Sequence, residues 1–148
     1  MKKRLAIQPD YKKIQSDEID NVISTLKNDF IPDEHANEIS ERLNNSLKNG
    51  CLDLSDCQIS DEILNQILPL LSVLNITSLD LGHNQIGPEG AIALAKELKT
   101  KTSLTHLNIR NNNIGDTGAK AIADALKTNR SLKHLNLEGN DIRTGAIA

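Results

Sequence analysis

The side chains of this sequence that could do chemistry return at nearly constant intervals. Two histidines, His106 and His134, lie 28 residues apart, and two aspartates, Asp53 and Asp80, lie 27 residues apart. Imidazole nitrogens bind transition metals and titrate near neutral pH, whereas paired carboxylates can exchange protons with a substrate. Either chemistry needs the paired side chains to lie on neighbouring structural elements. The function therefore depends on how the chain stacks the segments that carry them.

Four eight-residue segments share one pattern, with leucine or isoleucine at the first, third and last places. They are Leu52–Ile59, Leu79–Ile86, Leu107–Ile114 and Leu135–Ile142, at offsets of 27, 28 and 28 residues. Alternating apolar and polar residues at the start of each segment predict a short strand. Two of the intervening stretches carry apolar stripes at helical spacing: Ala91, Leu94, Ala95 and Leu98, and Ala119, Ile122, Ala123 and Leu126. The sequence thus predicts stacked strand–helix units with a continuous core.

The residue at the sixth place of each segment is expected to have a structural role, and a proline is expected to interrupt the helix after the first segment. The sixth place is occupied by Cys57, Asn84, Asn112 and Asn140. An amide with two donors and an acceptor can satisfy backbone groups where the chain leaves a strand, so we expect a structural ladder there, with Cys57 as a small buried substitute. Pro69 lies within the helix predicted for residues 60–71 and should end or kink it.

The arrangement L-x-x-L-x-L-x-x-N-x-I followed by a helix resembles the leucine-rich repeats of the ribonuclease-inhibitor-like class. That class also occurs in NOD-like receptors and in several bacterial effectors, and it alternates Asn and Cys at the position of Cys57. The resemblance covers residues 49 to 148. It implies an α/β fold, a right-handed solenoid forming part of a horseshoe. Because strands need about 4.8 Å each and helices about 10 Å, the parallel sheet should be concave and the helices convex.

Residues 1–50 lack the repeat and are predicted to form an N-terminal tail and a helical cap, with residues 51–148 holding about four strand units, the last incomplete. One helix should follow a cap at Ser16, and the second should follow Pro32-Asp33 and end at Asn49-Gly50. Their apolar stripes are Ile19, Val22, Ile23, Leu26 and Phe30, and Ala36, Ile39, Leu43 and Leu47. We expect Met1–Tyr11 to be a tail. Thr144–Ala148 falls where another helix would begin, so the last strand should offer an unpaired edge for a homodimer.

Composition argues against several classes of partner. The net charge of −3 gives no reason to expect nucleic acid. No stretch approaches the roughly 20 apolar residues of a membrane span or the apolar core of a signal peptide, so we expect a cytoplasmic protein, or one in the host cytosol if it is a secreted bacterial effector. Two cysteines exclude a disulfide framework. No motif indicates a cofactor or a metal site.

On the exposed face of the strands, the side chains should form three columns across the stack. The first is Cys51, Ser78, His106 and His134; the second is Asp53, Asp80, Asn108 and Asn136; the third includes Arg110 and Glu138. Two histidines without a third ligand would make only a weak metal site or a pH-sensitive contact, so we expect a polar, solvent-facing pair instead. Aspartates on an open sheet, without a cleft, are expected to form a solvated acidic patch that attracts a basic segment of a partner. Arg110 and Glu138 should pair across strands.

These observations predict a non-catalytic protein-interaction module with a protein partner on its concave face. The expected contact residues are Asp53, Asp80, His106, Asn108, Arg110, His134, Asn136 and Glu138. One alternative is a self-assembly or regulatory piece that docks through its C-terminal edge. Others are a GTPase activator that uses Arg110 and a bacterial effector.

Overall fold

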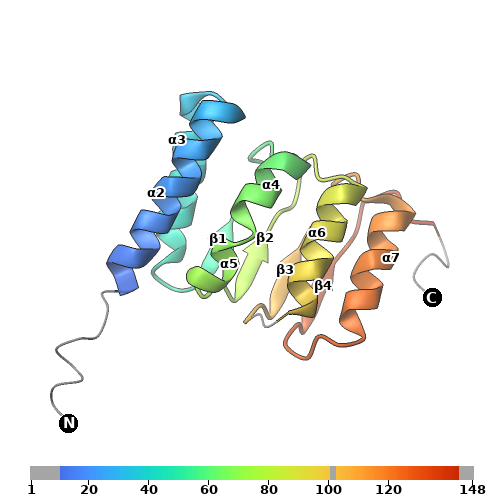
Figure 1. Cartoon of the computed structure of the whole chain (residues 1–148). Coiled ribbons are helices and arrows are strands. Elements are labelled where there is room, and N and C mark those ends of the chain that lie inside the picture. The colour runs from blue at the N-terminus through green and yellow to red at the C-terminus, as the bar shows by residue number, and fades with distance from the viewer. Residues whose placement is uncertain (1–10, 101–102, 144–148) are drawn as a thin grey trace, which may run out of the picture.

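The computed structural model describes residues 11–100 and 103–143, and its elements follow one another in a row along the molecule (Figure 1). Four short strands, β1 (Cys51–Asp53), β2 (Ser78–Asp80), β3 (His106–Asn108) and β4 (His134–Asn136), form a parallel sheet in the order β1-β2-β3-β4. The register pairs Leu52 with Leu79, Leu79 with Leu107, and Leu107 with Leu135. The predicted stacking of equivalent leucines on neighbouring parallel strands is confirmed.

Helices α4 (Asp61–Ile67), α5 (Leu70–Val73), α6 (Pro88–Lys99) and α7 (Gly115–Leu126) connect the strands and cover one face of the sheet (Figure 1). The helix predicted over residues 60–71 is broken between α4 and α5, as expected from Pro69, which lacks the N–H that would continue the hydrogen-bonding pattern. The Ser60 hydroxyl accepts the N–H of Ile63 at 3.3 Å and so starts α4.

Two further helices, α2 (Tyr11–Asp29) and α3 (Asp33–Ser46), lie at the β1 end of the row (Figure 1). Helix α3 contacts β1, and α2 packs against α3, α4 and α5. The chain leaves α3 through Gly50, whose φ of +75° and N–H bond to Ser46 O (2.8 Å) fit the expected left-handed ending.

Two details predicted for α2 are wrong. Ser16 lies inside the helix and does not cap it, because the backbone is already helical from Tyr11. Phe30, which the helical spacing predicts to be part of the buried stripe, is 42% exposed. The helix ends at Asp29 and the chain turns there, with the N–H of Ile31 bonded to Leu26 O, so that Ile31 packs against the core instead. The predicted tail, Met1–Tyr11, lies outside the described residues except for Tyr11.

The β4 end of the row is less covered than its interior. Leu126 was expected to face the core, but it is 37% exposed, whereas the equivalent Leu98 is 1% exposed because α7 packs over it. Leu132, Leu135 and Leu137 are half-buried, while their equivalents one repeat earlier are buried. No described element covers the far side of α7, and Thr144–Ala148 lies outside the described residues. None of the described helices has the length and apolar character needed to cross a bilayer.

Candidate functional site

Asparagine side chains join successive repeats where each strand ends. The Asn84 Nδ2 donates to Leu54 O and to Leu81 O, both at 2.9 Å, and its Oδ1 accepts the N–H groups of Cys57 (3.0 Å) and Ile59 (2.8 Å). Comparable bonds are made by Asn112 and Asn140. These amides satisfy backbone groups of two adjacent repeats at once, so their chemistry is used within the fold.

The residues of the second column, which the repeat pattern predicts only as contacts for a partner, also close the turns that follow the strands. In each strand the side-chain oxygen of the last residue accepts the backbone N–H two residues later. The bonds are Asp53 to Ser55 (2.9 Å), Asp80 to Gly82 (2.8 Å), Asn108 to Arg110 (3.1 Å) and Asn136 to Glu138 (3.0 Å). Asp and Asn side chains commonly close such turns. The presence of Asp or Asn directly before each predicted turn could therefore have indicated these hydrogen bonds from the sequence. Substitutions in this column therefore disturb the turns as well as any contact with a partner.

The acidic patch expected around Asp53 and Asp80 is partly neutralised. Arg42, on α3, lies with its guanidinium 3.4 Å from Asp53 Oδ1 and donates to Asp53 O at 2.9 Å. Desolvation raises the pKa of Asp53, but the hydrogen bonds from Ser55 and the charge of Arg42 outweigh it, so the pKa lies below 3.8. The repeat pattern could not reveal Arg42, because this residue precedes the repeats.

The register brings the two histidines of the first column together. The rings of His106 and His134 stack, with their centroids 4.3 Å apart and their planes inclined by 23°. The nitrogens of stacked rings lie in separate, nearly parallel planes, a poor arrangement for binding one ion between them. No group of three or more His, Cys, Asp or Glu in residues 13–100 and 103–143 could hold a metal. With Asp80, Asn108 and Lys133, the pair lines a shallow depression of about 550 Å³.

The third column forms the rim of this face. Arg110 contacts Glu138 at 3.4 Å, as expected, and its Nε is buried without a hydrogen-bond partner in the described structure. Beside it, His83 and Asn111 have positive φ values of 56° and 52°, and the Asn111 amide lies 3.2 Å from the His83 ring. Such backbone is uncommon for residues other than glycine. The rim thus combines an ion pair, a contact between His83 and Asn111, and two residues with left-handed backbone.

The two cysteines differ sharply in environment. Cys51 is exposed, whereas Cys57 is 1% exposed and its thiol lies 3.4 Å from Ser55 O. Desolvation raises the pKa of the Cys57 thiol from 9.0 to about 11. Because the thiolate is the reactive form, Cys57 should be inert near neutral pH.

We expect one thiol per folded chain to react with a chromogenic disulfide reagent at mildly alkaline pH, and two in denaturant. Cys51→Ser should abolish the native reaction, and Cys57→Ser should leave it unchanged. Rapid labelling of two thiols in the folded wild type would contradict the buried position of Cys57.

Comparisons with known proteins agree with the repeat pattern. The family described as "Leucine Rich repeat" matches residues 51–67, 74–95, 100–123 and 128–146. No curated protein matches the chain. Among solved structures, the chain is similar to "Leiomodin-1 Actin-Binding Site 2 (ABS2)", with 28% sequence identity and a TM-score of 0.55. The match covers 65% of this chain and 60% of that one.

Proposed function

The chain belongs to the leucine-rich repeat family, and from this premise we propose that it is a protein-binding module that uses the exposed face of its parallel sheet. The observation that carries the proposal is the stacked pair His106–His134 in a shallow polar depression that spans neighbouring repeats. The proposed contact residues are Asp53, Asp80, His106, Asn108, Arg110, His134, Asn136 and Glu138. These residues bind and do not catalyse.

Few side chains on this face are of the types that contribute most to the binding energy of protein interfaces. Interfaces commonly draw most of their binding energy from Trp, Tyr and Arg, and the described part of this face has no Trp, Tyr or Phe. The stacked imidazole pair offers an aromatic surface in their place. Of the carboxylates Asp53, Asp80 and Glu138, only Asp80 makes no ion pair in the described structure, so Asp80 is the proposed contact for a basic segment of the partner.

We propose actin as the partner to be tested first, because the similar structure is described as an actin-binding site. The replacement of His106 and His134 by alanine should weaken actin binding about tenfold or more. Both side chains are exposed, so their loss should leave the fold intact. Fluorescence anisotropy of labelled monomeric actin measures the affinity.

The matched control replaces Lys96 and Lys120, two exposed side chains of α6 and α7, by alanine, and it should bind like the wild type. Actin binding that survives the histidine double variant would overturn the assignment of the face. A wild-type chain that does not bind actin would overturn the choice of partner. The face would then be tested by photo-crosslinking in cell extract, with the crosslinker at position 106 and, as the control, at position 120.

A second candidate function is self-association through the β4 end, favoured by the 37% exposure of Leu126. Its test is sedimentation velocity over a range of concentrations. A mass that increases with concentration in the wild type, but not in Leu126→Lys, would support it. A GTPase-activating role has less support, because Arg110 is already held beside Glu138.

The finer predictions from the resemblance also stand as proposals. They are a right-handed, curved stack of the ribonuclease-inhibitor-like class, a cap within residues 1–50 before repeats in residues 51–148, and a cytoplasmic location or effector role. The contact of α3 with β1 supports the cap, since an uncovered first repeat would expose its apolar interior.

A further inference from the structure

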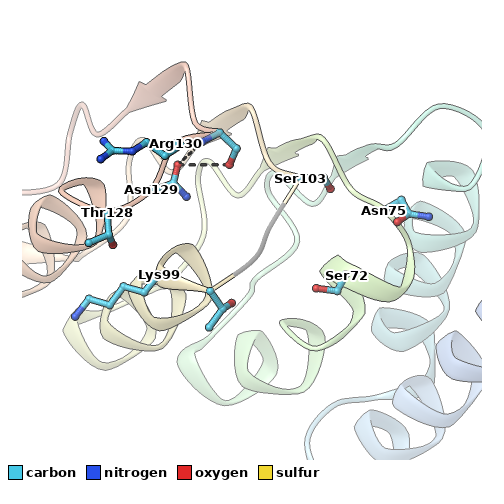
Figure 2. A pocket seen from close by; sticks show the side chains of 9 residues that line it. Ser72, Asn75, Lys99, Ser103, Thr128, Asn129 and Arg130 are labelled. Atoms are coloured by element: carbon cyan, nitrogen blue, oxygen red, sulfur yellow. Dashed lines mark hydrogen bonds between the residues drawn. The ribbon is translucent and has the colours of Figure 1, made fainter.

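A groove lies along the edge of the stack where the helices end and the strands begin (Figure 2). Its volume is about 650 Å³, and the side chains that line it are Ser72, Asn75, Lys99, Thr100, Ser103, Thr128, Asn129, Arg130 and Ser131. None of them is acidic, and the chain as a whole has a net charge of −3. The groove is therefore a local concentration of hydrogen-bond donors and positive charge, distinct from the exposed face of the sheet.

The groove extends across three successive repeats. Its small polar residues recur at 28-residue intervals in two columns: Ser72, Thr100 and Thr128, and Asn75, Ser103 and Ser131. The axes of neighbouring helices lie about 10 Å apart, so a groove that passes the ends of three helices is roughly 20 Å long. This is the length of about six residues of extended chain. An extended peptide matches this shape better than a compact ligand.

The carbonyl groups at the helix ends, which would repel an anion, are largely occupied. The Thr100 hydroxyl donates to Glu97 O at 2.9 Å, and the Asn129 amide donates to Leu98 O at 2.8 Å. The Thr128 hydroxyl lies 3.4 Å from Ala125 O. These bonds lessen the unfavourable effect of the helix C-termini on negative charge.

Several other groups of the groove have no partner within the described structure. Lys99 and Arg130 form no ion pair there, and the side chains of Ser72 and Asn75 make no hydrogen bond. In Figure 2, Ser72 and Asn75 lie toward one end of the groove, and Lys99 and Arg130 lie toward the other end, with their side chains extending away from Ser72 and Asn75. A chain lying along the groove would meet neutral polar side chains toward one end and cations toward the other.

We propose that this groove binds an extended acidic segment of a protein partner. Carboxylates of the segment bind Lys99 and Arg130, while its backbone contacts the polar columns. A nucleic acid fits less well, because the described lining of the groove has only two cations and no aromatic ring for stacking. The groove and the exposed face of the sheet would then contact different parts of one partner, or different partners.

The test uses a fluorescent peptide of roughly nine residues in which glutamate alternates with serine, long enough to exceed the groove. The wild-type chain should bind it at low salt and release it as salt is added. Lys99→Glu combined with Arg130→Glu should weaken binding about tenfold or more. The control, Lys96→Glu with Lys120→Glu, makes the same change in net charge outside the groove and should alter the affinity less than about twofold.

Circular dichroism checks that both double variants are folded, and the alanine variant of His106 and His134 should bind the peptide normally. Three results would overturn the proposal: no peptide binding by the wild type, equal loss in the groove and control variants, or tighter binding of a single-stranded oligonucleotide of equal charge that requires Lys99 and Arg130.

Discussion

Replacing Gly118 with valine should lower the free energy of unfolding by about 3 kcal/mol, because the helices α6 and α7 approach too closely for a side chain at this position. A Cβ atom built on Gly118 would lie 2.3 Å from Ile114 Cγ2 and 2.8 Å from Ala91 Cβ. Both neighbours are fully buried and cannot move into solvent. To make room, α6 must move away from α7 and Ile114 must shift from its buried position, and both changes loosen the core.

Urea denaturation monitored by circular dichroism measures this effect. Thr117→Val is the matched control, since it places the same β-branched side chain at the adjacent exposed position of α7. It should change stability by less than about 0.5 kcal/mol. Equal stability of the wild type and Gly118→Val would mean that α6 and α7 do not pack at this distance in solution.

Asn112→Ala should cost about 3 kcal/mol, because one side chain satisfies backbone groups of two repeats. Its Nδ2 donates to Leu81 O (2.9 Å) and Ile109 O (3.0 Å), and its Oδ1 accepts the N–H of Ile86 (2.9 Å). Alanine leaves these groups without partners in a place where water has little access.

Hydrogen exchange tests the assignment at the level of a single bond. The amide of Ile86 should lose protection in Asn112→Ala by more than the global destabilisation explains. Asn113→Ala, at the adjacent exposed asparagine, should leave both stability and the Ile86 amide unchanged. Undiminished protection of Ile86 in Asn112→Ala would show that the amide bond is not formed.

The sheet could be predicted from the sequence because the apolar residues that form its strands recur at a constant spacing. Once Leu79, Leu107 and Leu135 return at a constant interval, equivalent strands must lie side by side, and the residues directly before and after each leucine point to the opposite face and form columns. This is why the neighbouring positions of His106 and His134 followed from spacing alone. The break at Pro69 was equally predictable, since it depends on the local geometry of one residue.

The parts that escaped prediction lack this periodicity or depend on what surrounds them. Arg42 neutralises Asp53 from a helix outside the repeats, so no column contains it. Leu126 occupies an inward place in the stripe but is exposed, because burial there requires a following helix. The groove was visible in the sequence as polar residues at 28-residue spacing, but periodicity identifies apolar cores more readily than polar surfaces.

The asparagine bonds give the stack a direction. Asn84 bonds to Leu54 O in the preceding repeat, and Asn140 bonds to Ile109 O in the same sense. Each unit thus holds the loop of its predecessor in place. Under mechanical tension applied at the C-terminal side, the units should come apart one after another toward the N-terminus, and each rupture should weaken the anchorage of the next.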